Sequence, residues 1–118
     1  MTSLNPVKKI GKQITEVLTK RLGMSSHLAS VRAAELVNSV GIPDAEQQLQ
    51  RYPMHLSGGM CQRVAIAIAI ACEPKLLIAD EPTTALDVTI QAQILDLLKE
   101  QQTNKNMSVI LISHNLGI

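Results

Sequence analysis

The fold of this chain is indicated by KLLIAD at residues 75–80 and by MSVILIS at residues 107–113. Both runs are short and apolar, which is typical of strands that are buried on both faces. Between them, Asp87 can cap a helix whose apolar residues recur at helical spacing over residues 90–98. A strand, a helix and a second strand in this order predict a βαβ unit with parallel strands, and therefore an α/β fold.

Parallel strands place their carboxyl ends at one edge of a sheet, where open α/β sheets bind ligands. Asp80 ends the first strand, Glu81 follows it, and His114 follows the second strand. Asp80 is suited to hold Mg²⁺ together with phosphate oxygens, and Glu81 is a candidate base for an attacking water. His114 is a candidate phosphate ligand, because imidazole can donate a hydrogen bond without a permanent charge. Taken alone, the two carboxylates could equally be solvated charges at a strand end.

Upstream of the first strand, LSGGM at residues 56–60 precedes the apolar run 64–72. Alternating Val and Ile favour a strand there, whereas the alanines favour a helix. We interpret the run as a buried helix that Ser57 caps and that Gly58 and Gly59 open. Such an N-terminus can bind an anion, because small residues let backbone N–H groups approach phosphate oxygens. The Ser-Gly-Gly sequence is a weak signal alone, and its spacing to the Asp-Glu pair makes it specific.

Residues 1–55 predict three helices. The first is expected at about residues 6–22, with Pro6 at its first helical position. The second helix is expected to be capped by Ser25 or Ser26 and to end at Gly41. The third is expected to begin at Asp44, with Gln47 completing a capping box, and to stop before Pro53. We therefore expect a helical subdomain at 1–55, the glycine-rich loop with its helix at 56–73, and the βαβ unit at 74–118.

Composition limits the classes of function. The chain has 118 residues, is 46% hydrophobic and has a formal net charge of +1, so it has no basic footprint for nucleic acid. Its longest apolar run, residues 64–72, is well below the roughly 18 residues that span a bilayer. Cys61 and Cys72 lie about 16 Å apart along one helix and cannot bridge each other. We expect no direct membrane insertion and reduced thiols, typical of a cytosolic protein.

Together these motifs resemble the nucleotide-binding domain of ATP-binding-cassette (ABC) transporters over essentially the whole chain. Residues 56–60 are similar to the family signature loop, residues 76–81 to the Walker B strand, residues 84–87 to the D-loop and His114 to the switch histidine. The amino-acid sequences of residues 2–6 and 79–93 are similar to those of importers for oligopeptides, dipeptides and nickel.

The resemblance implies an ATP-hydrolysing subunit, with ATP and Mg²⁺ as cofactors, that couples hydrolysis to transport. It implies a homo- or heterodimer in which each ATP lies between the core of one subunit and the signature loop of the other. The residues so assigned are Ser57, Gly58, Gly59, Met60 and Asp87 for nucleotide binding and the dimer interface, Asp80 for the metal, and Glu81 and His114 for catalysis. Transmembrane permease subunits would hold the protein at the cytoplasmic face of the inner membrane.

The chain also departs from the family pattern. It contains no G-x-x-x-x-G-K-[ST] phosphate loop, because Gly11-Lys12 lacks the first glycine and is followed by Gln13. Cys61 and His55 stand where the resemblance leads us to expect an arginine and an acidic residue. We therefore expect an internal fragment that is inactive as an ATPase when alone. The alternative is a non-catalytic remnant or interaction module that pairs with a full-length ABC ATPase.

Overall fold

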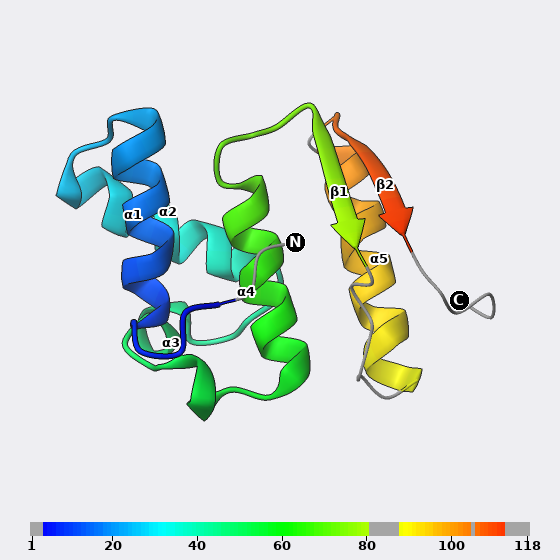
Figure 1. Cartoon of the computed structure of the whole chain (residues 1–118), viewed down its shortest axis with the longest axis horizontal. Helices are drawn as coiled ribbons and strands as arrows, with labels where there is room; N and C mark the ends of the chain where they lie inside the picture. The colour runs from blue at the N-terminus through cyan, green and yellow to red at the C-terminus, as the bar shows by residue number, and fades with distance from the viewer. Residues whose placement is uncertain (1–3, 81–87, 105, 113–118) are drawn as a thin grey trace.

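The computed structural model describes residues 4–80, 88–104 and 106–112, which form a helical part and a βαβ part. In chain order the elements are α1 (Ile10–Leu22), α2 (Ser26–Ser39), α3 (Ala45–Leu49), the 3-10 helix η1 (Pro53–His55), α4 (Gly58–Ile70), β1 (Leu76–Asp80), α5 (Val88–Asn104) and β2 (Ser108–Ile112). Figure 1 shows α1 to α4 together on one side of the molecule and β1, β2 and α5 on the other. The predicted mixture of helix and strand is confirmed.

The first helix begins later than predicted. α1 starts at Ile10, with Lys9 as its N-cap, rather than at about residue 6. A turn precedes it, because the Asn5 side chain accepts a hydrogen bond from the Val7 N–H at 3.0 Å. Asn and Asp side chains favour such local turns over helix. Pro6 therefore lies in this turn and not at a first helical position, so that part of the prediction is wrong.

The next two helices test the predicted caps. The Ser25 hydroxyl accepts a hydrogen bond from the Leu28 N–H at 3.2 Å and caps α2, as expected. Gly41 follows the end of α2 with φ of 82°, a left-handed conformation that favours glycine. Asp44 precedes α3, but its φ is 53° and its side chain makes no capping hydrogen bond. The predicted capping box is wrong, because an N-cap side chain reaches the first turn from extended backbone.

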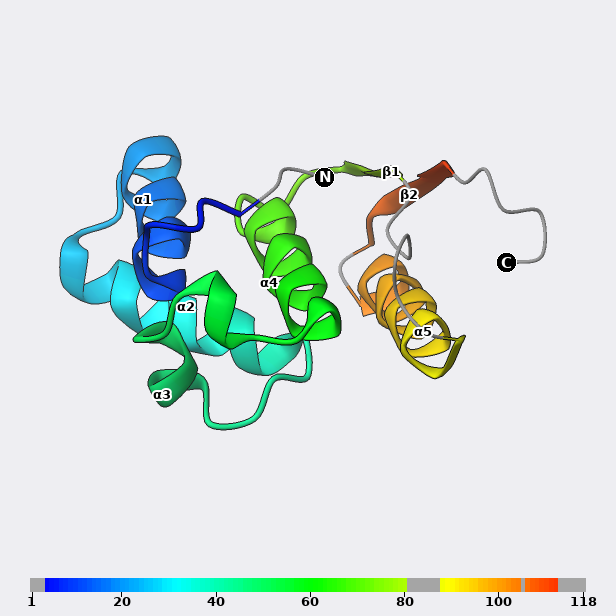
Figure 2. The same ribbon diagram turned by 60° about the horizontal axis from the view of Figure 1, so that its bottom comes forward.

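The βαβ prediction is confirmed. β1 and β2 are parallel, with Leu76 paired in register to Ser108 and Asp80 to Ile112. Figure 2 shows α5 lying along one face of the two strands. Among the described residues, no helix covers the other face, whose large apolar side chains are 41–49% exposed. These side chains belong to Leu76, Ile78, Ile110 and Ile112.

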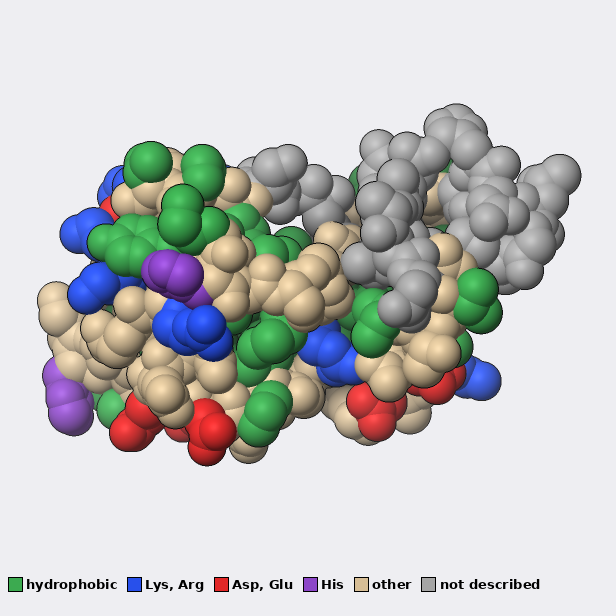
Figure 3. All heavy atoms as spheres, turned by 90° about the horizontal axis from the view of Figure 1, so that it is seen from below, with side chains coloured by type: hydrophobic (Ala, Val, Ile, Leu, Met, Phe, Trp, Pro, Cys, Tyr) green, Lys and Arg blue, Asp and Glu red, His purple; other side chains and the backbone are tan. Residues whose placement is uncertain are grey.

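The core between the helices is aliphatic. Its fully or almost fully buried side chains are Ile10, Ile14 and Leu18 of α1, Ala29, Ala33, Leu36 and Val37 of α2, and Val64, Ile66, Ala67 and Ile70 of α4. The small alanines of α2 let it pack closely against α1. The charged side chains whose burial the structure describes lie outside this core, and Figure 3 shows basic and acidic groups interspersed on the face seen from below, with no broad region of one sign.

Candidate functional site

The glycine-rich loop lies at the N-terminus of α4. The Ser57 hydroxyl accepts a hydrogen bond from the Met60 N–H at 3.2 Å and caps the helix, as the sequence predicts. Ser57 and Gly58 are exposed to solvent. The first N–H groups of a helix have no intrahelical acceptor, and the helix dipole adds positive potential there. The exposed N-terminus can therefore donate hydrogen bonds to an anion such as a phosphate.

Gly59 faces the interior instead. It is buried, and a Cβ atom at this position would lie 2.7 Å from Cγ2 of Ile90 on α5. Real Cβ atoms essentially never approach another heavy atom so closely. The second glycine is therefore required by packing between α4 and α5. The sequence interpretation, in which small residues serve the approach of a phosphate, missed this role.

The segment just before the loop is held by local hydrogen bonds. The Tyr52 N–H donates to Nδ1 of His55 at 3.2 Å, and the two rings meet edge to face at 6.0 Å. The Cys61 thiol, on the first turn of α4, donates to the Pro53 carbonyl at 3.4 Å. Burial raises the pKa of the Cys61 thiol above its usual value. Of the two departures from the expected sequence, Cys61 thus helps fix η1 against α4, whereas the contacts of His55 lie within the segment of η1 itself.

Arg63, one turn after Gly59, is a residue that the sequence analysis did not single out. Its Nη1 donates to the Val40 carbonyl at 2.7 Å, and its Nη2 donates to Oε1 of Gln93 at 3.4 Å. Val40 ends α2, whereas Gln93 lies on α5. Arg63 therefore joins α4 to two other helices.

Of the residues predicted at the strand ends, only Asp80 is among those that the structure describes. Asp80 is the last residue of β1, and its register partner Ile112 is the last residue of β2. The carboxyl ends of the strands thus meet at one edge, as expected. Glu81, Asp87 and His114 lie outside the described residues, so their roles, like that of Asp80 towards Mg²⁺, stay predictions.

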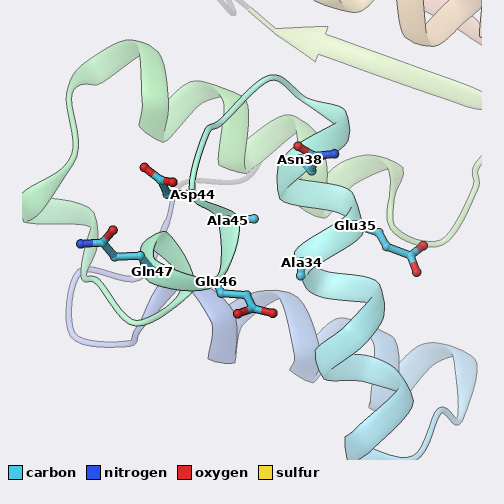
Figure 4. A pocket seen from close by; sticks show the side chains of 7 residues that line it. All are labelled: Ala34, Glu35, Asn38, Asp44, Ala45, Glu46 and Gln47. Carbon is cyan, nitrogen blue, oxygen red and sulfur yellow. The ribbon is translucent and has the colours of Figure 1, made fainter.

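A hollow of about 600 Å³ lies elsewhere, between α2 and α3. Its lining includes the carboxylates of Glu35, Asp44 and Glu46, and Figure 4 shows Glu35 and Asp44 pointing away from each other. Within the described residues no group of three or more His, Cys, Asp or Glu side chains could hold a metal ion. This hollow is therefore a surface feature of the helical part, separate from the glycine-rich loop.

Among the described residues, no helix combines the length and the apolar character needed to cross a membrane. The cysteines of this part, Cys61 and Cys72, are both free thiols. Cys72 lies beyond Ala71, the C-cap of α4, so the expectation that one helix carries both cysteines is wrong.

Comparison with known proteins gives a consistent result. The family model described as ABC transporter matches residues 2–84. Over all 118 residues the chain is 59% identical to the oligopeptide transport ATP-binding protein OppD of Bacillus subtilis and 58% identical to the dipeptide transport ATP-binding protein DppD of Escherichia coli K12. It is 56% identical to the oligopeptide transport ATP-binding protein AmiE of Streptococcus pneumoniae.

The chain spans only about a third of the length of these relatives, namely 33% of OppD and AmiE and 36% of DppD. Among solved structures, it is similar to the dimeric ATP-binding cassette MJ0796 in a post-hydrolysis state bound to ADP and Pi. The TM-score is 0.77 at 31% identity, and the match covers 97% of this chain and 49% of the cassette chain.

Proposed function

The chain belongs to the ABC transporter family, and from that premise we propose that it provides the signature loop and the hydrolytic edge of an ATP site in a peptide importer. In this function ATP hydrolysis drives transport across a membrane. The observation that carries the proposal is the exposed N-terminus of α4, where Ser57 and Gly58 face solvent and Gly59 is anchored to α5. This geometry suits a loop that receives a phosphate from outside its own chain.

The loop acts in trans in this proposal. Ser57 and the first N–H groups of α4 contact the γ-phosphate of a nucleotide bound by a second ABC ATPase subunit, with Met60 beside them. The similar cassette MJ0796, which is a dimer bound to ADP and Pi, supports a dimeric arrangement. Backbone donors fixed before the reaction stabilise charge on the transferring phosphate without further reorganisation.

The hydrolytic edge serves the chain's own nucleotide. We assign Mg²⁺ to Asp80, the polarisation of the attacking water to Glu81, and a hydrogen bond to the γ-phosphate to His114. Asp87, immediately before α5, is assigned to the dimer interface. The parallel pairing of β1 and β2 supports this assignment, since it brings the carboxyl ends of both strands, at Asp80 and Ile112, to one edge of the sheet.

We assign peptides as the transported class, because the relatives reported above are named for oligopeptides and dipeptides. The sequence resemblance alone also allowed nickel. Transport requires transmembrane permease subunits, which would hold this protein at the cytoplasmic face of the membrane.

Association in trans is the direct test. The 118-residue chain is titrated into Bacillus subtilis OppD with ATP and EDTA, which prevents hydrolysis, and complex formation is followed by light scattering. We expect an ATP-dependent complex that the Ser57→Arg variant weakens at least tenfold, because charge-assisted hydrogen bonds contribute about 1.5–3 kcal/mol each.

Ser25→Arg is the matched control. Ser25 is also an exposed N-cap serine that accepts from the third following N–H at 3.2 Å, but it lies at the start of α2. We expect its variant to lose helix capping and to keep the complex. Equal loss in both variants, or no ATP-dependent complex with the unchanged chain, would contradict the proposed role of the signature loop.

A further inference from the structure

The C-terminal end of α2 lacks a cation of its own. The last turn of α2 contains no basic residue, although the final carbonyls of a helix carry negative partial charge. Arg63 supplies this charge from α4, through the 2.7 Å hydrogen bond from Nη1 to the Val40 carbonyl. Gly41 makes the approach possible, because a Cβ atom there would lie 2.8 Å from Nη1. Arg63 thus caps a helix that lies 23 positions earlier in the sequence.

The other arm of the same guanidinium reaches α5. Its Nη2 donates to Oε1 of Gln93 at 3.4 Å. Arg63 and Gln93 line a hollow of about 270 Å³, together with residues at the end of α2 and with Asp96 and Glu100 of α5. The guanidinium therefore spans a gap between α2 and α5 that other side chains leave open.

This bridge lies close to the signature loop. Gly59 and Arg63 are four residues apart on α4, and Ile90 and Gln93 are three residues apart on α5, so each pair shares one helix face. α4 is thereby fixed to α5 at two neighbouring points, the close approach of Gly59 to Ile90 and the bridge from Arg63 to Gln93. The N-cap Ser57 lies two residues before Gly59, the first of these points.

We propose that Arg63 is a positioning residue for the signature loop. Its planar guanidinium ties α4 to the end of α2 and to Gln93 of α5, and this holds the loop in place. The functional part of this inference rests on the proposed role of the loop in trans. A guanidinium suits the task, because its donors diverge in a fixed plane, whereas a lysine ammonium is a point charge on a flexible stem.

The structural part is tested on the chain alone by electron spin resonance. Nitroxide labels are attached to cysteines introduced at Ser30 of α2 and Lys99 of α5, in a background with Cys61→Ser and Cys72→Ser. We expect Arg63→Lys and Gln93→Leu to broaden the distribution of label distances about twofold. The control Gln102→Leu, an exposed glutamine on the same helix, should leave the width unchanged.

Thermal unfolding distinguishes the hydrogen bond from Arg63 to the Val40 carbonyl from the one to Gln93. We expect Gln93→Leu and Arg63→Lys to unfold near the temperature of the unchanged chain, since both leave a cation near the Val40 carbonyl. Arg63→Met should lower the midpoint, because it removes that cation. An unchanged distance distribution in Gln93→Leu and Arg63→Lys would overturn the bridge.

The functional part is read from the complex with OppD described above. We expect Gln93→Leu to raise the dissociation constant about fivefold, the factor for one hydrogen bond of ordinary strength, while Gln102→Leu leaves it unchanged. A broadened distribution with unchanged affinity would make Arg63 a purely structural residue and overturn its role towards the loop. Failure of the unchanged chain to associate would instead contradict the proposed function, and the distance measurement would still decide the bridge.

Discussion

Substitution of Gly59 by alanine should lower or raise the stability of the folded chain, depending on which residue occupies position 90. With Ile90 present, the new Cβ would lie 2.7 Å from Cγ2 of a β-branched side chain whose χ1 is restricted, so α4 or α5 must move. Overpacking of this kind costs about 1–3 kcal/mol, whereas alanine improves helix propensity over glycine by at most about 1 kcal/mol. We expect Gly59→Ala to destabilise the chain by about 1–2 kcal/mol.

In a chain that carries Ile90→Ala, the effect of Gly59→Ala on stability should change sign. Ile90→Ala removes the obstructing Cγ2 atom, so only the propensity gain remains, and Gly59→Ala should then stabilise the chain by up to about 1 kcal/mol. The assay is urea unfolding followed by circular dichroism for the four chains of the double-mutant cycle, which isolates the coupling between the two positions. An effect of the same sign and size in both backgrounds would refute the packing explanation for Gly59.

Three further outcomes can be measured on the same chain. Ser57→Ala should lower the free energy of unfolding by about 1 kcal/mol, and Ser25→Ala should lower it by a similar amount, because each removes one N-cap hydrogen bond; urea titrations of both variants check this. In a Cys72→Ser background, alkylation of Cys61 by iodoacetamide should rise at higher pH in the folded chain than in urea, because burial raises the thiol pKa; identical pH profiles would contradict that environment. We expect the chain to self-associate through its exposed apolar sheet face, and Ile78→Lys to shift it towards monomer in sedimentation velocity by placing a charge there; a monomeric unchanged chain, or unchanged association of the variant, would contradict this.

The raised pKa of Cys61 also sets a direction for stability. The folded chain retains the thiol proton at pH values where the unfolded chain has lost it, so the unfolded state binds fewer protons in that range. The contribution of Cys61 to the free energy of unfolding is fully present below the ordinary thiol pKa and decreases as the pH rises through the folded-state pKa. Cys61→Ser should make the unfolding free energy less dependent on pH over this alkaline range.

Element types could be predicted from the sequence because local signals agreed with tertiary packing. Ser25 and Ser57 are N-caps, and each has the extended backbone that lets its hydroxyl reach the first turn. Asp44 satisfied the same sequence criterion and failed, because its backbone is left-handed at φ 53°. A residue type indicates that a cap is possible, whereas the path of the preceding chain decides whether it forms.

Helical spacing was less informative about which residues are buried. Leu28 and Val31 fit the apolar pattern of α2 but are 59% and 47% exposed, while Ala29 and Ala33 are fully buried. A close approach of two helices selects small side chains, and hydrophobicity ranks alanine below leucine and valine. The sequence pattern therefore located the helix and its buried second half, at Leu36, Val37 and the C-cap Val40, but misjudged which residues of its first half are buried.

Arg63 shows a similar limit in the candidate site. Two signals were visible in the sequence, namely a helix end without a basic residue and Gly41 just beyond it. Neither indicates which distant arginine supplies the missing charge, because that depends on how α4 crosses α2. Glu81, Asp87 and His114 remain predictions from motif and spacing, since they lie outside the described residues.

The geometry of the glycine-rich loop explains how one short motif can serve packing and also leave a helix N-terminus exposed for the proposed binding. Its exposed side, Ser57 and Gly58, presents the helix N-terminus to solvent, whereas Gly59 fits against Ile90. A loop that only bound phosphate could tolerate movement, but donors must already be in place to stabilise developing charge. The buried glycine and the bridge through Arg63 provide that fixation on the side facing away from the ligand. Loss of either should therefore weaken binding in trans, and for Arg63 this holds even though that residue is assigned no contact with the nucleotide.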